Sequence, residues 1–344
     1  MWMTAAECSE GGAFELTGWV ELDGTRLSRP ALEEILERRR DCISGFGGEF
    51  FLRWGACRAR DHFGIIPGDC PKGTLICDAE PEKRILPSPP ALPLRDAIVE
   101  AVKLRSDEGV TALSGGVDST LVAALAGLGC VAVGLEDSHD LDRAGRAAQV
   151  LGLECARVTI RPAEVEAALP VVIGTIPKKD PVNTGIALTQ FFLTRWAGEQ
   201  GYRRILTGQG ADELFGGYFR YLETATLEED LGRDFAGLEE QASRDQVIAA
   251  LHGTYLSMPY LDVRVVRAAR DIPCWEKVRE GRRKVCLREV AEHYIPREFA
   301  WYEKRAMQYG SGIAKELQKI ARRNGYKTSV QGYIDHISRV EHGQ

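Results

Sequence analysis

Apolar and polar residues alternate in short runs through the first 84 residues of the chain. Two stretches in this region, at 14–22 and 47–54, predict β-strands. Only residues 30–39 place their apolar side chains at helical spacing, with Pro30 in the first turn. We therefore expect residues 1–84 to form a small β-rich domain.

A different pattern follows residues 85–93, which contain four of the chain's 15 prolines and predict a stiff linker. From residue 94 onward, helical stretches alternate with short apolar strands, which are expected at 110–113, 130–135, 155–160 and 204–207. Such alternation is typical of an α/β domain in which a doubly wound parallel sheet is covered by helices on both faces. After Tyr221 the pattern is mainly helical. This domain is expected to cover 94–325, with weak order from Asn324 and a tail at 326–344.

Composition limits the class of protein and its partners. The 344 residues are 44% apolar and 27% charged, which is typical of a soluble protein of about two domains. The formal net charge of −6 argues against nucleic acid as the main partner. Two basic clusters, within 279–284 and 319–327, are interpreted as a phosphate-facing group and a solvated helix face. No apolar run could span a membrane and no secretory signal is visible, so we expect a cytoplasmic protein.

The nine cysteines form no C-x-x-C pair, and in a cytoplasmic protein they are expected to be reduced and mostly buried. Cys57, Cys70 and Cys77 lie close together in sequence, with His62 between the first two. Their spacing matches no standard zinc pattern. Ordinary core cysteines are therefore favoured, and a metal site remains an open alternative.

The most informative stretch is Ser114-Gly115-Gly116-Val117-Asp118-Ser119, which lies between an expected strand and an expected helix. Two glycines allow backbone N–H groups to approach an anion closely, and the positive end of the helix dipole adds to the attraction. The serine hydroxyls can bind phosphate oxygens, and Asp118 can hold a magnesium ion. The lysine of a Walker phosphate loop is absent. The stretch instead resembles the pyrophosphate loop of ATP pyrophosphatases, which cleave ATP to AMP and pyrophosphate.

A second motif follows the expected strand at 204–207. Residues 206–218 read LTGQGADELFGGY, with four glycines around an acidic pair. A tight loop of this kind presents carboxylates to a metal ion or an amine. Together the two motifs resemble the synthetase domain of the asparagine synthetase family, which also includes β-lactam synthetases. Further similar elements follow at 258–262 (MPYLD), 272–273 and 295–296 (both Ile-Pro), 284, 287–288 and 304, so that the resemblance covers residues 94–317.

The resemblance implies a role for each matching residue. Asp118 and Asp212 are expected to bind Mg2+ beside the phosphates of ATP. Lys284 is expected to bind the pyrophosphate, with Arg283 able to share that work, and Lys304 to face the α-phosphate and the carboxylate under attack. The residues expected to contact the nucleotide are Ser114, Gly115, Gly116, Asp118, Ser119, Leu135, Gly208 and Gly210.

The chain departs from the family in the second motif. Gln209 stands where the family normally has a glutamate that helps to deprotonate the incoming amine, and an amide cannot act as a base. We therefore expect Gln209 to orient the amine in the catalytic site, while Glu213 or a group of the substrate accepts the proton. Candidates for binding the carboxylate substrate are Asn183, Thr184 and Arg220.

A second departure lies at the N-terminus. Residues 48–50 and 59–65 are similar to elements of the family's glutaminase domain. That domain depends on a cysteine as its first residue, whereas this chain opens Met-Trp-Met-Thr and its first cysteine is Cys8. We expect residues 1–84 to be a degenerate glutaminase-like domain that cannot release ammonia from glutamine.

The resemblance thus predicts an ATP- and Mg2+-dependent ligase that forms asparagine from aspartate and free ammonia and releases AMP and pyrophosphate. Gln209 favours one alternative, a ligase of the same mechanism with another carboxylate and amine. A nucleotide-binding protein without turnover and a tRNA-modifying enzyme are further alternatives. A separate glutaminase as the source of ammonia and a homodimer are hypotheses that the family suggests.

Overall fold

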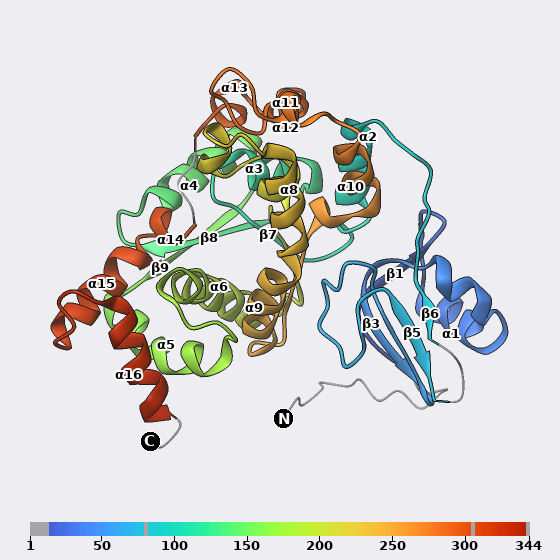
Figure 1. Ribbon diagram of the computed structural model, residues 1–344, viewed down its shortest axis with the longest axis horizontal. Coiled ribbons are helices and arrows are strands. Elements are labelled where there is room, and N and C mark those ends of the chain that lie inside the picture. Colours follow the sequence, from blue (N-terminus) through green and yellow to red (C-terminus); the bar gives the residue numbers. More distant parts are fainter. Residues whose placement is uncertain (1–13, 79–81, 304–306, 342–344) are drawn as a thin grey trace.

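The computed structural model of the protein describes residues 14–78, 82–303 and 307–341. Its N-terminal part is an antiparallel sheet of six strands in the order β2-β1-β3-β4-β5-β6 (Figure 1). The strands are β1 (Phe14–Leu22), β2 (Thr25–Arg26), β3 (Gly47–Trp54), β4 (Cys57–Arg60), β5 (Thr74–Cys77) and β6 (Lys83–Arg84). Helix α1 (Arg29–Arg38) buries its apolar face against this sheet. The expected β-rich part of the fold and its one α-helix are therefore confirmed.

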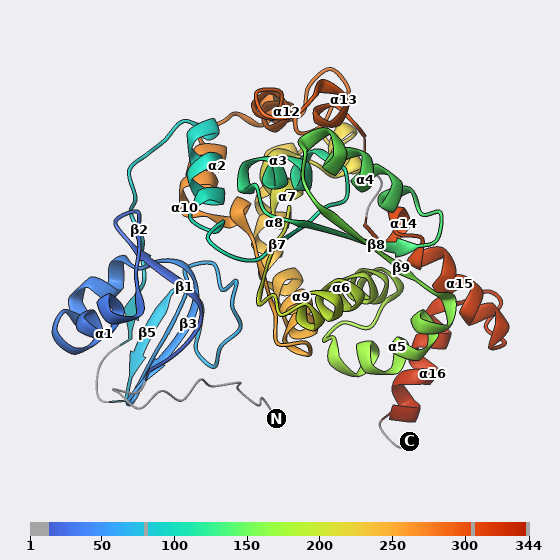
Figure 2. The same cartoon turned by 180° about the vertical axis from the view of Figure 1, so that it is seen from behind.

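The second part of the chain contains a parallel sheet of five strands in the order β11-β10-β7-β8-β9. The strands are β7 (Val110–Ala112), β8 (Cys130–Leu135), β9 (Cys155–Ile160), β10 (Arg204–Leu206) and β11 (Tyr255–Ser257). One apolar core lies between the sheet and α5 (Pro162–Thr175), α6 (Pro181–Glu199), α9 (Leu238–Ala250) and α15 (Ile313–Arg323). A second core lies between the sheet and α2 (Leu94–Lys103), α3 (Val117–Ala126), α4 (His139–Leu151) and α10 (Val263–Arg270). Figures 1 and 2 show the two helix layers on opposite faces, so the expected doubly wound α/β fold is confirmed.

The C-terminal part of the chain is mainly helical, as expected, with two differences from the sequence pattern. Strand β11 is not predicted, because three residues are too few to show alternation and their place depends on pairing with β10. The prediction that the tail is weakly ordered is wrong for residues Val330–Glu341. They form helix α16, which packs on α5 and buries Tyr333 and Ile334. The other helices are α7 (Ala211–Phe215), α8 (Leu227–Ala236), α11 (Cys274–Lys277), α12 (Val285–Ala291), α13 (Arg297–Ala300) and α14 (Met307–Gly310).

Two of the nine cysteines contradict the expectation that all are reduced thiols. Cys57 on β4 and Cys77 on β5 are opposite each other in the antiparallel pair and form a disulfide bond. They are separated by 20 residues, and only the strand register brings them together. Because each is bonded to the other, neither is free to ligate a metal ion. Within the described ranges there is no group of three or more His, Cys, Asp or Glu side chains that could hold one.

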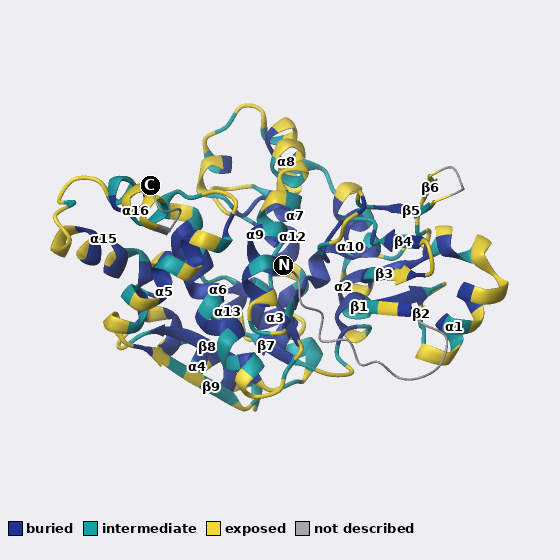
Figure 3. Cartoon of the chain, turned by 90° about the horizontal axis from the view of Figure 1, so that it is seen from below, coloured by how far each residue is buried: buried dark blue, intermediate teal, exposed yellow. Residues whose placement is uncertain are grey.

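Residues 85–93 run between the two sheets and form neither helix nor strand. Figure 3 shows buried residues in both sheets and on the helix faces that cover the second one. In the part of the chain that the structure describes, we find no helix with the length and hydropathy that a membrane crossing requires.

A row of buried, alternating charges joins the N-terminal sheet to the second domain. Glu49 of β3 pairs with Arg105 at 2.9 Å, and Arg105 pairs with Asp262 at 2.9 Å. Asp262 contacts Arg264 at 3.0 Å, and Arg264 contacts Glu21 of β1 at 2.6 Å. Burial lowers the pKa of the Arg105 guanidinium, but Glu49 and Asp262 more than offset this effect and raise it above its usual value. Each charge is therefore compensated by a neighbour, as a buried ionic network requires.

Candidate active site

The first motif forms a turn between β7 and the start of α3, as expected. The Ser119 hydroxyl accepts a hydrogen bond of 3.1 Å from the backbone N–H of Ser114, and the two serine hydroxyls lie 2.8 Å apart. Gly116 is the N-cap of α3, and no side chain among the described residues caps this helix end. The backbone N–H groups of the first turn are therefore available to an anion, and the helix dipole favours negative charge there.

The second motif packs directly on the first at Gly208. A Cβ atom at this position would lie 2.9 Å from Cβ of Asp118 and 3.0 Å from the backbone nitrogen of Ser119. Only glycine permits such a close approach. From the adjacent element, the Tyr260 hydroxyl donates a hydrogen bond of 3.0 Å to the backbone carbonyl of Asp118. The two motifs thus form one site where β7 and β10, which are neighbours in the sheet, end.

We expect Gly208→Ala to slow nucleotide-dependent turnover about tenfold or more. The added methyl group would force the loop after β10 away from α3, and overpacking of this kind costs about 1–3 kcal/mol. The measurement is the rate at which labelled pyrophosphate enters ATP. Gly232→Ala on α8 is the control, because a Cβ there meets no atom within 4 Å. Equal rates for the two variants would contradict the proposed close packing.

Lys284 connects the two predicted magnesium ligands. Its ammonium group lies 2.6 Å from Asp118 Oδ2 and 2.7 Å from Asp212 Oδ1, and its side chain is buried. Burial lowers the pKa of Lys284, but the two carboxylates more than offset this effect and raise it above its usual value. A Cβ at Gly217 would lie 1.8 Å from Asp212 Oδ1 and 2.2 Å from Lys284 Cε, so this contact also requires glycine. Three residues that are far apart in sequence therefore form one charged cluster.

Asp118 and Asp212 fit a magnesium site by their chemistry. Their carboxylates converge on a single cation, the ammonium of Lys284, and Mg2+ prefers oxygen ligands of this kind. Mg2+ is usually bound by one or two carboxylates, with substrate phosphates and water completing the shell. Two carboxylates beside the N-terminus of α3 match that pattern, because the phosphates would lie at the helix end.

Gln209 is held rigidly by a buried ion pair. Its side-chain amide donates to Asp245 Oδ2 and accepts a hydrogen bond of 3.3 Å from the Thr207 hydroxyl. Asp245 is fully buried and also accepts from Arg244 at 2.8 and 2.9 Å. Arg244 in turn donates a hydrogen bond of 2.7 Å to the side-chain oxygen of Asn183. The amide of Gln209 is therefore fixed in one orientation at the edge of the site.

A cavity of about 80 Å³ lies beside Gln209, between the second motif and α9. Its polar lining comes from Asp212, Glu213, Tyr218 and Gln241, and its apolar lining from Leu238, Ala242 and Met258, with Gln209 and Gly210 completing it. Glu213 Oε1 accepts hydrogen bonds from the Tyr218 hydroxyl and from Gln241 Nε2, the latter at 3.1 Å. Burial, and then the charge of Asp212, raise the pKa of Glu213 above its usual value.

Two further residues were predicted for catalysis or nucleotide binding, Leu135 and Lys304. Leu135 ends β8, at the same edge of the sheet as the two motifs. Lys304 lies outside the described residues. Glu303, which precedes it, accepts hydrogen bonds from Arg283 and Arg288, so the chain is anchored up to that point.

None of the three candidates for substrate binding lines the cavity beside Gln209. The side-chain oxygen of Asn183 accepts a hydrogen bond from Arg244, as described above. Thr184 is buried, and its hydroxyl has no hydrogen-bond partner in the described part of the chain. Arg220 is about half exposed and pairs with Asp234 on α8. The cavity beside Gln209 is lined by other residues.

The residues that sequence reasoning missed are on α9. Gln241 and Asp245 lie 28 and 36 positions from the motif residues that they contact. The one signal for them is a run of polar residues, Arg244-Asp245-Gln246, in a helix that is otherwise packed against the apolar core. These three side chains are buried, which is unusual for charged residues unless they are paired.

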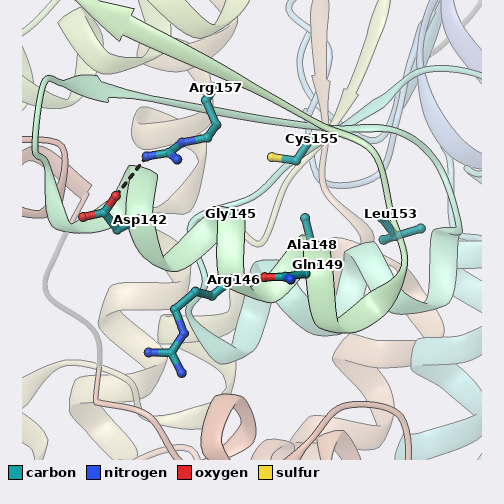
Figure 4. A pocket seen from close by; sticks show the side chains of 8 residues that line it. All are labelled: Asp142, Gly145, Arg146, Ala148, Gln149, Leu153, Cys155 and Arg157. Carbon is teal, nitrogen blue, oxygen red and sulfur yellow. Dashed lines mark hydrogen bonds and ion pairs between the residues drawn. The ribbon is translucent and has the colours of Figure 1, made fainter.

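A larger groove of about 570 Å³ lies away from both motifs, between α4 and β9 (Figure 4). Its charged lining includes Asp142 and Arg157, which pair with each other at 2.9 Å. Burial raises the pKa of the Cys155 thiol in this groove, which makes the thiol a poor nucleophile. The groove shares no lining residue with the cavity beside Gln209. Size alone therefore does not identify the site.

Comparison with known proteins identifies relatives of this chain. The "Putative asparagine synthetase (glutamine-hydrolyzing) 1" of Methanocaldococcus jannaschii is 32% identical over 290 residues, covering 72% of this chain and 53% of the relative. Carboxyethyl-arginine beta-lactam-synthase of Streptomyces clavuligerus is 30% identical over 249 residues, covering 69% and 48%. Asparagine synthetase B of Escherichia coli is 28% identical over 250 residues, covering 64% and 45%.

The chain spans about half the length of these curated relatives. Among solved structures, a glutamine-dependent NAD+ synthetase from Acinetobacter baumannii aligns with 86% of this chain and 53% of its own, at 13% identity. The TM-score is 0.33, and we infer nothing from a likeness of that size. The family model of asparagine synthase matches residues 93–247 and 236–337, which together hold both motifs and the Asp118–Lys284–Asp212 cluster. The chain therefore belongs to the asparagine synthase family.

Proposed function

We propose that this protein is an ATP-dependent ligase that activates a carboxylate as its adenylate and transfers it to an amine nitrogen, releasing AMP and pyrophosphate. The observation that carries this proposal is the contact of Lys284 with both Asp118 and Asp212 beside the N-terminus of α3. A helix N-terminus binds phosphate, and paired carboxylates suit the cation that accompanies it. Family membership supports the same chemistry.

Each group in the cluster has a task in this reaction. The N–H groups of α3 and the hydroxyls of Ser114 and Ser119 would bind phosphate oxygens. Asp118 and Asp212 would hold Mg2+, which supplies charge stabilisation for the phosphates when bound. Lys284 has three N–H donors, of which two are used by the carboxylates, so that it can also donate to the departing pyrophosphate. Gly208 allows the second motif to approach the phosphates.

We further propose that the nitrogen comes from free ammonia. Three of the four cysteines at 14–78 are poorly suited to glutamine hydrolysis, because Cys57 and Cys77 are bonded to each other and burial raises the pKa of Cys70, while Cys42 is a free thiol. Glu21 and Glu49 of this sheet instead bind the second domain. The sheet would then serve as a structural support, and ammonia would arrive from solution or from a separate glutaminase.

Aspartate is the proposed carboxylate, because two of the relatives carry the name asparagine synthetase. The partly buried Gln209–Asp245 contact favours the alternative, another carboxylate and amine, because it places a fixed amide instead of a base at the edge of the site. The name of the Streptomyces relative indicates that a different product is possible within related sequences.

The test incubates the purified protein with ATP, Mg2+ and aspartate, with ammonium chloride or glutamine as the nitrogen source. We expect equal amounts of AMP and asparagine with ammonium and none above background with glutamine. AMP formation only with another carboxylate from a panel would support the alternative. Equal use of glutamine would contradict the proposed ammonia dependence, and the absence of AMP with every carboxylate would contradict the ligase.

A further inference from the structure

We propose that Tyr260 is a positioning residue for the phosphate-binding end of α3, and that the segment around it links the N-terminal sheet to both motifs. This bridging segment comprises residues 257–262, from the end of β11 through the short 3-10 helix Pro259–Leu261, and all six residues are buried. The inference rests on the proposed ligase function, because it gives the N-terminal sheet a task in nucleotide binding.

The hydroxyl of Tyr260 holds the start of α3. It donates a hydrogen bond of 3.0 Å to the backbone carbonyl of Asp118, the second residue of that helix. The first turn of α3 carries the N–H groups and the carboxylate that we assign to the phosphates and their cation. The Tyr260 side chain itself is fully buried. It therefore acts on a bound nucleotide through the orientation of α3.

The bridging segment also packs on the second motif at three points. Its tyrosine ring lies edge-on to Phe215, with 5.9 Å between the ring centroids and 79° between the planes. A Cβ atom at Gly210 would lie 2.9 Å from Leu261 Cδ2. The Ser257 carbonyl accepts a hydrogen bond of 2.9 Å from the backbone N–H of Thr207. A shift of this segment would therefore move both motifs.

The N-terminal sheet holds the bridging segment from the other side. Glu49 of β3 accepts hydrogen bonds from the Ser257 hydroxyl at 2.5 Å and from the backbone N–H of Met258 at 2.8 Å. At the other end of the segment, Asp262 pairs with Arg105, which also pairs with Glu49. Packed side chains and hydrogen-bond networks of this kind carry coupling between separate sites. A change at Glu49 is therefore expected to reach α3.

The hydroxyl separates this positioning role from simple packing. The ring fills the space beside Phe215, and a phenylalanine ring would fill it equally well. A buried hydroxyl is unfavourable unless it forms a hydrogen bond, and here it bonds to the Asp118 carbonyl. Tyr260→Phe therefore removes the contact with α3 and preserves the packing on α7.

The first experiment measures how Tyr260→Phe binds an ATP analogue with a methylene group between its α- and β-phosphorus atoms, which cannot be cleaved to AMP. At fixed Mg2+, the affinity should fall roughly three- to tenfold, the usual effect of losing one hydrogen bond. The maximal rate of pyrophosphate exchange at saturating ATP should change less than threefold, because the hydroxyl supports binding and not bond breaking. Tyr255→Phe is the matched control, since its hydroxyl bonds to Arg204 at 2.6 Å, and it should bind the analogue like wild type.

The second experiment tests whether the N-terminal sheet acts through the same segment. Glu49→Gln should weaken binding of the analogue at least threefold, although Glu49 belongs to the other sheet. In the double variant with Tyr260→Phe, the loss should be smaller than the product of the two single losses, because both changes act on one chain of contacts. Glu21→Gln is the control: it breaks a buried pair of the same interface with Arg264, which lies beyond the segment, and should weaken binding less.

The outcomes separate this proposal from the proposed function. Analogue binding that depends on Tyr260, in a protein that makes no AMP, would support the positioning role and contradict the ligase. AMP formation with equal analogue affinity in wild type and Tyr260→Phe would support the ligase and overturn the positioning role. An equal loss of affinity in Tyr260→Phe and Tyr255→Phe would also overturn it. Single losses that multiply in the double variant would overturn the link through the bridging segment, and Tyr260→Phe alone still tests the positioning role if Glu49→Gln does not fold.

Discussion

Lys284→Met is expected to lower pyrophosphate exchange by a factor of roughly 100 to 1,000, the usual effect of removing one charge-stabilising donor from an active site. The physical reason is the position of the ammonium group, 2.6 Å from Asp118 and 2.7 Å from Asp212. Without it, two carboxylates face each other, and the departing pyrophosphate loses its cation. Methionine keeps an unbranched apolar stem that is one atom shorter than the lysine side chain, so the change is mainly one of charge.

A binding measurement distinguishes this role from simple damage to the fold. Because Lys284 and Mg2+ would use the same carboxylates, Lys284→Met should bind Mg2+ more tightly than wild type in the absence of nucleotide. Lys277→Met is the matched control, since Lys277 is similarly buried but burial lowers its pKa, and among the described residues no carboxylate pair holds it. A wild-type rate of pyrophosphate exchange in Lys284→Met would contradict the proposed role of Lys284. An equal loss of that rate in Lys284→Met and Lys277→Met would contradict it as well.

Glu49→Ala is expected to destabilise the whole chain by about 3–5 kcal/mol, the usual cost of breaking a buried ion pair. Glu49 is fully buried and accepts hydrogen bonds from Arg105, Ser257 and the backbone nitrogen of Met258, at 2.9, 2.5 and 2.8 Å. Trp19 Nε1 of the N-terminal sheet also donates to Glu49, at 3.2 Å, so removing Glu49 would leave donors of both domains without an acceptor. Met258 also lines the cavity beside Gln209, so removing the acceptor of its backbone N–H would also disturb the candidate site.

Urea unfolding of the full chain measures this effect, with the midpoint and slope compared among variants. Glu15→Ala on β1 is the control, because Glu15 is exposed, its ion pair with Arg53 is 3.7 Å long, and surface pairs contribute about 0–1 kcal/mol. A loss below about 1 kcal/mol for Glu49→Ala would show that the network does not hold the two sheets together. In Glu49→Ala, the rate of pyrophosphate exchange into ATP should fall together with the free energy of unfolding.

The parts of the fold that were predictable are those with strong local patterns. The runs of β8 and β9 are apolar or alternating over six residues each, and their predicted bounds agree with the structure. Strand β11 has three residues, and its membership of the sheet depends on the partner β10, which no local pattern reveals. The disulfide between Cys57 and Cys77 likewise depends on the register of β4 and β5.

In the candidate site, too, some contacts could be predicted from the sequence and others could not. The convergence of Asp118 and Asp212 could be anticipated, because both follow strands of one parallel sheet and the carboxyl ends of such strands share an edge. That Lys284 bridges them was not predictable, because it depends on the packing of the segment before α12 against that edge. The contact of Gln209 with Asp245 similarly requires the position of α9.

The most direct test of the central proposal follows oxygen from the carboxylate substrate. The protein is incubated with ATP, Mg2+, ammonium and aspartate labelled with 18O in its carboxylates, and AMP is analysed by mass spectrometry. Activation as an adenylate predicts one 18O atom in each AMP, because the carboxylate oxygen stays on the α-phosphate when the amide forms. Label in inorganic phosphate with formation of ADP, or AMP without label, would contradict the adenylation that we propose for the Asp118–Lys284–Asp212 cluster.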